Sequence, residues 1–298
     1  MPISPSGKLR TIKQVRGKPT ILITMGDPSG IGPEVIVKAL ASPRVRRLAN
    51  FFVIGGKKYK SSGRASMEYL KTALAILRKK KNAGLVTGPI SKEAINRAGF
   101  HYDGHTEFLA KETNSTKFAM MLIGGPLRVT LVTRHISLKD VHKNISQKKI
   151  IDAIELTHDF LAGYLNKRFP KIAVASVNPH AGEGGIFGDE EKRIIAPSIA
   201  KAKRKYKNIC GPVAPDAVFY DAYKGRVDAV ICMYHDQGLI PLKMIARDTG
   251  VNVTLGLPFV RTSPDHGTAF DIAGKGKANP SSMIEAIKMA ARLIKIRC

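Results

Sequence analysis

Short β-rich runs alternate with segments of helical periodicity along the chain, and this alternation is the feature that most limits its fold. The runs are bounded by turn-forming residues, as strands are. They cover residues 20–23, 51–54, 84–87, 128–132, 172–177, 229–233 and 251–255. Strands separated by helices favour a largely parallel sheet with helices packed on it. The sequence therefore predicts an α/β fold.

Three segments have the apolar face of a helix that packs on a sheet. Residues 67–77 carry apolar side chains at helical spacing, and residues 150–165 do the same behind Ser146, which is suited to cap a helix. The last helix is predicted to begin at the capping-box pattern formed by Ser282 and Glu285. We see no internal repeat and no low-complexity linker.

The composition is that of a folded globular protein, with 44% hydrophobic and 24% charged residues in a chain of 298. Residues 1–16 lack the apolar stretch of a secretory leader, and no later segment is apolar over the length of a membrane helix. Cys210, Cys232 and Cys298 form no C-x-x-C pair. We expect a cytoplasmic protein without a membrane partner.

The formal net charge of +26 is unusual and invites a nucleic-acid interpretation. However, basic clusters such as 44–47, 78–81 and 201–207 are scattered, and no aromatic residues are interleaved with them as stacking platforms. We expect a solvated, lysine-rich surface and no nucleic-acid partner, with polyanion binding as the weaker alternative. A positive field also suits collection of an anionic, phosphorylated substrate.

Residues 26–34, with the sequence Gly-Asp-Pro-Ser-Gly-Ile-Gly-Pro-Glu, follow a predicted strand and open a helix. The segment matches neither the G-x-G-x-x-G dinucleotide fingerprint nor a P-loop. Two interpretations stay open. The segment is either a tight turn or the lining of a ligand site beside a helix N-terminus.

Three histidines follow predicted strands, namely His135, His180 and His235. In an open α/β sheet the carboxyl ends of the strands are where ligands bind. A lone histidine there is usually structural, but three in equivalent positions predict a divalent metal site, because imidazole is the commonest metal ligand in proteins. Asp236 could orient a ligand or accept a proton, and the sequence does not separate these roles.

Further polar residues are suited to an anionic substrate. His105 and Thr106 stand at the start of a helical stretch, where either an anion site or a simple helix cap is possible. Lys243, Asn252 and Arg261 add cationic and amide donors for phosphate or carboxylate. Residues 266–280 have little periodicity and closely spaced glycines, which favours a binding loop.

Taken together, the motifs resemble those of the 4-hydroxythreonine-4-phosphate dehydrogenase family. The resemblance runs in order through residues 26–34, 87–89, 104–108, 178–183, 234–238 and 251–267. The first segment and residues 266–280 are also similar to those of isopropylmalate and isocitrate dehydrogenases, whose fold this family shares. The resemblance implies two α/β/α lobes with the active site in the cleft between them.

The resemblance also implies a division of the chain and a set of roles. One lobe, formed by residues 1–128 and 258–298, would hold the cofactor, and residues 129–257 would bind metal and dimerise. The implied metal ligands, shared across a homodimer interface, are His135, His180 and His235. The implied substrate-binding residues are His105, Thr106, Lys243, Asn252 and Arg261, with His105 and Asp236 as catalytic candidates. The implied residues for NAD or NADP are His266, Gly267, Asp271 and Asn279.

The implied reaction is oxidation of 4-hydroxythreonine 4-phosphate with a zinc, magnesium or cobalt ion that polarises the substrate hydroxyl. The 3-keto acid formed would lose carbon dioxide to give 3-amino-2-oxopropyl phosphate, a precursor of pyridoxal phosphate. The chain departs from the family by being shorter near residues 55–63 and by carrying Arg134 before a metal histidine. Residues 63–69 and 117–122 also resemble relatives that oxidise threonate or erythronate 4-phosphate. A histidine-zinc hydrolase with Asp236 as base is the alternative of another class.

Overall fold

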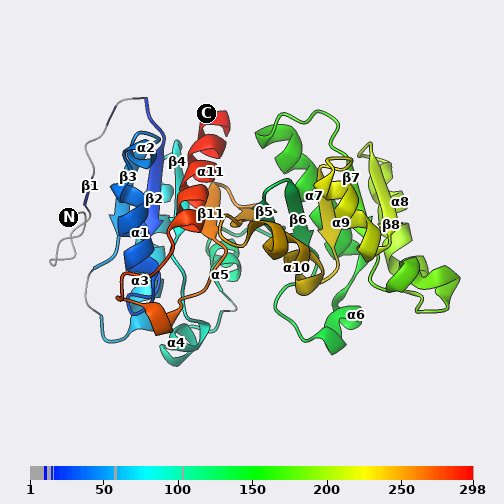
Figure 1. The fold of residues 1–298 in the computed structure, drawn as a ribbon, viewed down its shortest axis with the longest axis horizontal. Coiled ribbons are helices and arrows are strands. Elements are labelled where there is room, and N and C mark those ends of the chain that lie inside the picture. Colours follow the sequence, from blue (N-terminus) through cyan, green and yellow to red (C-terminus); the bar gives the residue numbers. More distant parts are fainter. Residues whose placement is uncertain (1–9, 12–14, 16, 57–58, 103, 298) are drawn as a thin grey trace. The chain divides into compact units, whose positions relative to one another are not determined.

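The computed structural model describes residues 10–11, 15, 17–56, 59–102 and 104–297, which form two compact units. Unit 1 comprises residues 1–114, 251–253 and 257–298, and unit 2 comprises residues 115–250 and 254–256. Most of the predicted leaderless segment 1–16 lies outside the described residues, as do Cys298 and residues 57–58 of the shortened segment. Each unit is an α/β structure by itself (Figure 1).

Unit 1 is built on a sheet with the strand order β1-β3-β2-β4-β11-β10. β2 pairs in parallel with β3 and β4, and β4 with β11, whereas β1–β3 and β10–β11 are antiparallel. The strands are β1 (Arg10–Thr11), β2 (Thr20–Thr24), β3 (Asn50–Ile54), β4 (Ala83–Thr87), β10 (Val251–Leu255) and β11 (Val260–Pro264). The helices are α1 (Gly32–Ala41), α2 (Pro43–Arg46), α3 (Ser62–Leu77), α4 (Lys92–Arg97), α5 (His105–Glu112) and α11 (Ser281–Arg297), with the short 3-10 turn η4 (Phe270–Ile272) before the last.

Helices cover both faces of this sheet. α3 and α5 pack on one face, where Leu22 and Leu85 of the strands meet Leu70 and Phe108 of the helices. Burying each such side chain contributes about 1.5–3 kcal/mol. α11 packs against β4 and β11 on the other face. A Cβ at Gly84 would lie 2.6 Å from Cδ1 of Ile294, so glycine lets α11 approach the sheet closely.

Unit 2 has the strand order β5-β6-β9-β7-β8, with an antiparallel β5–β6 hairpin and parallel pairing from β6 onward. α9 and α10 contribute to the core on one face, and α7 and α8 contact strands and each other. The strands are β5 (Ala119–Gly124), β6 (Leu127–Leu131), β7 (Ile172–Ala175), β8 (Ile209–Val213) and β9 (Ala229–Cys232). The helices and helical turns are η1 (Leu138–Asp140), α6 (Val141–Asn144), α7 (Gln147–Tyr164), η2 (Pro179–Gly185), η3 (Glu191–Ile195), α8 (Ala196–Lys203), α9 (Pro215–Tyr223) and α10 (His235–Ala246).

The predicted α/β fold with largely parallel pairing is confirmed, and the Ser146 cap is confirmed by a hydrogen bond from Lys149 N to Ser146 Oγ. The predicted capping box is wrong. α11 begins at Ser281, the hydroxyl of Ser282 accepts the N–H of Asp265, and Glu285 pairs with a lysine on its own helix. The domain boundaries at 128/129 and 257/258 stay a prediction, while the compact units divide at 114/115 and so place all of β6 in unit 2.

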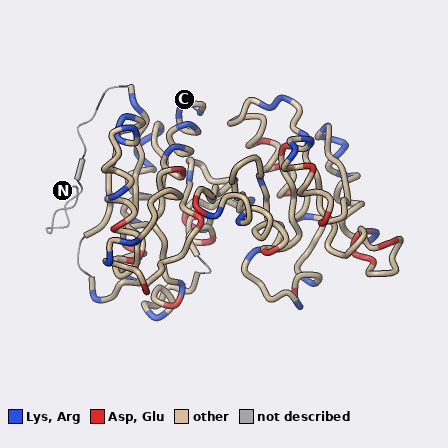
Figure 2. The backbone as a smooth tube through the Cα atoms, in the orientation of Figure 1, with Lys and Arg blue, Asp and Glu red and all other residues tan. Residues whose placement is uncertain are grey.

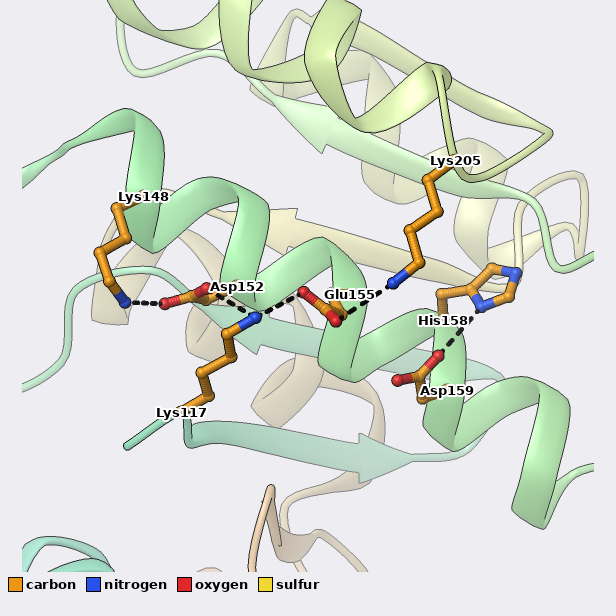
Figure 3. Close-up of polar contacts among 7 residues, drawn as sticks. All are labelled: Lys117, Lys148, Asp152, Glu155, His158, Asp159 and Lys205. Carbon is orange, nitrogen blue, oxygen red and sulfur yellow. Dashed lines mark hydrogen bonds and ion pairs between the residues drawn. The ribbon is translucent and has the colours of Figure 1, made fainter. Parts of the chain in front are cut away.

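Positive side chains are distributed over both units (Figure 2). On α7 the carboxylates of Asp152 and Glu155 are paired with lysines, of which Lys148 lies on the same helix and Lys117 and Lys205 come from other segments (Figure 3). Lys117 Nζ lies 2.9 Å from Glu155 Oε2, and Lys205 Nζ lies 3.4 Å from Oε1 of the same carboxylate. Hydrogen bonding to Lys117 lowers the pKa of Glu155. Asp152 and Glu155 therefore each lie within ion-pair distance of two lysines.

The predicted absence of interleaved aromatic residues is wrong for the cluster 201–207, which contains Tyr206. The ring centroid of this residue lies 4.9 Å from Lys205 Nζ, and its side chain is 6% exposed. Phe169 lies near the same cluster. The guanidinium of Arg168 lies 5.1 Å from the ring centroid of Phe169, and Lys207 Nζ lies 5.7 Å from it. The cations thus occupy the vicinity of the exposed ring, as in a cation–π contact. Among the described residues no helix combines the length and the apolar character needed to cross a membrane.

Candidate active-site residues

His135 and His235 lie side by side in unit 2, with ring centroids 5.6 Å apart. Their position follows from the strand ends. Beyond β6 and β9, Val132 N donates to Cys232 O and the hydroxyl of Thr133 donates to Met233 O at 2.7 Å. These bonds continue the β6–β9 pairing, so two histidines that are far apart in sequence come together where the strands stop.

Asp236 holds the ring of its neighbour His235. Its Oδ1 lies 2.6 Å from His235 Nδ1, although the Asp236 side chain is largely exposed. A carboxylate on one ring nitrogen fixes the tautomer and leaves the other nitrogen for a metal. Of the two predicted roles for Asp236, the contact supports ligand orientation directly.

His180 lies in η2, a turn with unusual backbone conformation. His180 has φ 50° and ψ 31°, and positive φ angles continue through Gly184. Its ring lies beside Phe187, at 6.3 Å between centroids. Within the described part of the chain, no group of three or more His, Cys, Asp or Glu side chains could hold a metal ion. A single chain therefore brings His135 and His235 together but does not complete a site with His180.

Arg134, which departs from the family pattern, packs on an aromatic ring. Its guanidinium lies 4.9 Å from the ring centroid of Phe118, within unit 2. Planar guanidinium groups stack well on aromatic faces. This contact gives the residue a packing role next to His135.

Arg261 carries a buried positive charge in unit 1. Its side chain, on β11, is 2% exposed, and Nη2 donates to Thr87 Oγ1 at 2.6 Å. Burial lowers the pKa of Arg261 to about 10, and the nearby carboxylate of Glu107 acts in the opposite direction. A guanidinium placed this way is suited to a carboxylate or phosphate ligand. Thr87, at the end of β4, is a polar neighbour that the sequence-based list of candidates missed.

His105, the first residue of α5, is held as a neutral imidazole. Its pKa is lowered well below the ordinary value of 6.5 by burial and by the positive charge of Arg261. Its Nε2 is enclosed and has no hydrogen-bond partner within the described structure. Thr106, next in α5, is buried. A buried polar atom without a partner costs about 1–3 kcal/mol, which favours a role in binding a ligand.

Asn252 lies on the same face of the sheet as Arg261. It stands opposite Ser263 in the β10–β11 register, and residues two apart on a strand share a face. Its Oδ1 is enclosed and makes no hydrogen bond to any described residue, and the same holds for Thr24 Oγ1 at the end of β2. Lys243, by contrast, is exposed on α10 and belongs to unit 2.

The loop 266–280 is fastened to α1. Ile31 N donates to Thr268 O at 2.8 Å. The Glu34 carboxylate accepts the N–H groups of Ala278 and Gly276, and Lys38 Nζ donates to their carbonyl oxygens at 2.7 and 2.8 Å. The Glu34–Lys38 ion pair thus holds the loop backbone through both kinds of peptide group, because Glu34 accepts from N–H groups and Lys38 donates to carbonyl oxygens.

The predicted cofactor residues differ in their exposure and in the hydrogen bonds that they make within the loop. His266 Nε2 is enclosed without a partner in the described structure, and its Nδ1 lies 3.1 Å from Gly267 O. Gly267 and Asp271 are exposed. Asn279 Oδ1 accepts both the N–H and the hydroxyl of Ser281, which makes a turn before α11. The carbonyl of Asn279 is therefore already engaged.

The glycine-rich segment at residues 26–34 makes a tight turn and is joined to this loop, while its predicted part in lining a ligand site stays a prediction. Asp27 is fully buried, and its carboxylate accepts Ser29 N and the Ser62 hydroxyl. Gly26 has φ +76°, and a Cβ there would lie 2.2 Å from Pro89 O. The tight-turn interpretation accounts for Asp27 and Gly26, while Glu34 at the end of the segment accepts hydrogen bonds from the loop 266–280.

The comparison with protein families places the chain as a whole in one family. The family model of the pyridoxal phosphate biosynthetic protein PdxA matches residues 24–290. The chain belongs to the PdxA family. A 4-hydroxythreonine-4-phosphate dehydrogenase of Geobacter metallireducens is 43% identical, with 94% of this chain and 97% of that protein covered. That alignment runs over 329 positions, more than the 298 residues present here, in agreement with a shortened chain.

Other PdxA relatives and solved structures are similar over nearly the whole chain. The D-threonate 4-phosphate dehydrogenase of Salmonella typhimurium is 40% identical, covering 92% of this chain and 98% of that protein. The crystal structure of 4-hydroxythreonine-4-phosphate dehydrogenase from Klebsiella pneumoniae has a TM-score of 0.81 at 37% identity, covering 93% of this chain and all of that one. Isocitrate dehydrogenase from Methylococcus capsulatus, with a TM-score of 0.53 at 18% identity over 91% of this chain and 84% of that one, shares the fold alone.

Proposed function

We propose that this PdxA-family chain is an NAD- or NADP-dependent dehydrogenase that oxidises 4-hydroxythreonine 4-phosphate in the synthesis of pyridoxal phosphate. The observation that carries the proposal is the pairing of buried Arg261 with a neutral, enclosed His105 in a chain matched by the PdxA family model over residues 24–290. A buried cation beside polar atoms that lack protein partners is suited to an anionic hydroxy acid.

In this proposal the residues of unit 1 bind and orient the substrate. Arg261 and Asn252 supply a charge and an amide from β11 and β10, and His105 supplies an imidazole nitrogen that is neutral at physiological pH. A neutral imidazole can donate or accept a hydrogen bond to a substrate hydroxyl. Thr106 and Lys243 complete the predicted substrate set, with Lys243 contributed by α10 of unit 2.

The metal proposal rests on the donor set. The His135 and His235 rings are adjacent, and Asp236 holds the Nδ1 side of His235, as a carboxylate does for a metal-bound histidine. We assign the third donor to His180 of a second copy, because one chain does not gather three donors within its described residues. A bound zinc, magnesium or cobalt ion would act as a Lewis acid on the substrate hydroxyl.

A homodimer is therefore part of the proposal. The outer face of α10, the helix that begins at His235, exposes Ile240 (61%), Met244 (82%) and Ile245 (43%). Adjacent exposed apolar side chains on one helix are typical of a protein interface. Seating a second copy there would cover this face and bring its polypeptide near the His135–His235 pair.

The nicotinamide cofactor is assigned to the loop 266–280 and would accept the hydride that leaves the substrate carbon. His266 has an enclosed ring nitrogen available to a ligand, and Gly267 is exposed, as is Asp271. Asn279 would contact the cofactor through its NH2 group, because its carbonyl oxygen is engaged with Ser281. The keto acid formed from the substrate loses carbon dioxide, which gives 3-amino-2-oxopropyl phosphate. We infer a cytoplasmic enzyme, in agreement with the free thiols of Cys210 and Cys232.

A second candidate substrate is D-threonate or D-erythronate 4-phosphate. It is favoured by the 40% identity to the Salmonella typhimurium enzyme, which is close to the 43% found for the Geobacter metallireducens enzyme. The histidine-zinc hydrolase alternative leaves the fastened loop 266–280 without a role. It predicts no use of a nicotinamide cofactor.

The proposal is tested by the absorbance of reduced nicotinamide with metal-loaded protein and each phosphorylated acid in turn. We expect kcat/KM to be higher for 4-hydroxythreonine 4-phosphate than for D-threonate 4-phosphate. In Arg261→Met the KM for the preferred substrate should rise at least about tenfold, since a charge-assisted contact contributes about 1.5–3 kcal/mol. Higher kcat/KM for the sugar acid would reassign the substrate, and no reduction with either would contradict the dehydrogenase proposal.

A further inference from the structure

A framework of buried polar side chains joins the three strand ends that carry the histidines of unit 2. Its members are Thr133 (4% exposed), Ser176 (0%), Glu191 (4%) and Gln237 (6%). We propose that Gln237 and Glu191 are positioning residues that hold His235 and His180 in place for metal binding. The inference rests on the proposed metal site and adds two residues that do not touch the metal or the substrate.

Gln237 connects the end of β9 to the end of β7. Its Oε1 accepts Met233 N at 2.7 Å, and its Nε2 donates to Ser176 O at 2.7 Å. Both backbone groups lie just beyond their strands, Met233 after β9 and Ser176 after β7. One amide side chain, which has a donor and an acceptor side by side, bonds to both groups.

The end of β6 is tied to the same point. The hydroxyl of Thr133 donates to Met233 O at 2.7 Å, and Gln237 accepts the N–H of Met233. Met233 is two residues before His235, and Thr133 is two residues before His135. The backbone of Met233 is therefore held through both its N–H and its carbonyl group. These two bonds fix the segments that lead to the adjacent His135 and His235.

Glu191 continues the framework toward His180. Its Oε1 accepts Val177 N at 2.8 Å and Asn178 N at 2.9 Å, and its Oε2 accepts Asn178 Nδ2 at 2.9 Å. Ser176 adds a bond from its hydroxyl to Asn178 O. A buried carboxylate that accepts three N–H groups makes strong, charge-assisted bonds, so the segment leading to His180 is tightly held.

The turn that presents His180 needs such support. Positive φ angles at His180 (50°), Ala181 (54°) and Glu183 (41°) place side-chain-bearing residues in the left-handed region, at a cost of about 1–2 kcal/mol each. The turn wraps the carboxylate, because a Cβ at Gly182 would lie 2.8 Å from Glu191 Oε2. Strained backbone of this kind persists where surrounding contacts determine it, and it is concentrated at functional sites.

A framework of this kind would act on metal affinity. Residues that orient metal ligands through hydrogen bonds typically change affinity 10–100-fold when they are removed. Gln237→Met keeps the length of the side chain but loses both hydrogen bonds. We expect it to weaken zinc binding by about 10–100-fold, and to alter the visible spectrum of the cobalt-substituted protein, because the ligand geometry changes.

The matched control is Thr130→Val. Thr130 and Thr157 share a buried hydroxyl–hydroxyl bond of 2.8 Å between β6 and α7. The substitution removes one buried hydrogen bond of the same unit without touching Gln237 or its partners. Its thermal stability should fall, while its zinc affinity and cobalt spectrum stay those of the unchanged protein.

Zinc affinity is measured by competition with a chromophoric chelator on the full chain, with folding checked by circular dichroism. Glu191→Gln is the second variant. Its remaining side-chain oxygen can still accept the backbone N–H groups of Val177 and Asn178, but its NH2 group would face the NH2 group of the Asn178 side chain and the bond between them would be lost. If the unchanged protein binds no zinc or cobalt, the proposed metal site is wrong. If it binds and both folded variants bind equally well, the metal site stands and the positioning role is contradicted. Weakened binding in either folded variant, but not in Thr130→Val, supports it.

Discussion

At the scale of single residues, the protonation state of His105 is the sharpest consequence of the structure. Burial and the charge of Arg261 lower its pKa well below 6.5. Because the folded-state pKa of His105 is lowered, its contribution to the free energy of unfolding is fully present above pH 6.5. This contribution falls as the pH drops below that value, where the unfolded chain takes up a proton first. We expect the ring nitrogens of His105 to show a neutral imidazole at pH 6 in 15N NMR spectra, with His105→Asn used to assign them. An imidazolium spectrum at that pH would contradict the enclosed environment.

Single residues also show how far the sequence could predict the site. Strand-end position alone indicated His135, His180 and His235, whereas the residues left the roles of His105 and Arg261 open until the family resemblance implied that both bind substrate. Thr87 was missed as a candidate, although it is the last residue of a parallel strand, and ligands bind at the carboxyl ends of such strands. The left-handed backbone at His180 could not be predicted, because it depends on Glu191, which is distant in space until the chain has folded.

At the scale of elements, the attachment of the loop 266–280 to α1 leads to a prediction for Lys38. Its ammonium donates to the carbonyl oxygens of Gly276 and Ala278. Lys38→Met should loosen the loop and raise the KM for the nicotinamide cofactor about tenfold, the effect of losing hydrogen bonds to a charged group, while zinc affinity is unchanged. The control is Lys288→Met, which breaks an exposed pair with Glu285 on α11. Equal KM values in the two variants would show that the attachment does not serve cofactor binding.

The elements that the sequence did not indicate have physical reasons for their weak signal. β11 is central and fully buried, yet it contains Arg261, Thr262 and Ser263, so its composition is that of a surface strand. β8 contains a Gly-Pro pair, which ordinarily marks a turn. β5 is a continuous apolar run rich in Met and Leu, which periodicity does not distinguish from a buried helix. Strands such as β3, β4 and β9, which contain β-branched residues and lie between helices in the sequence, were predicted correctly, as were β6 and β10.

At the scale of the whole molecule, the 49 basic residues far outnumber the 23 acidic ones. The basic side chains are distributed over both units and do not form a single stripe among the described residues (Figure 2). Such a field attracts small anions and is screened by salt over about 8–10 Å. The proposed assembly of two copies would complete the metal site, because it would bring His180 of one copy to the His135–His235 pair of the other. The proposed function is thus the oxidation of an anionic hydroxy acid at a metal site that two chains share.

Subunit complementation tests this claim most directly. His135→Ala and His180→Ala proteins are each purified, mixed, dissociated and reassembled with metal, and reduction of the nicotinamide cofactor is followed with 4-hydroxythreonine 4-phosphate. Each variant alone should be inactive. Random reassembly should recover about one quarter of the unchanged protein's activity, because half of the dimers then contain one intact site of two. If the mixture stays as inactive as its components while the unchanged protein, treated in the same way, regains activity, the three histidines do not form a site shared in this way.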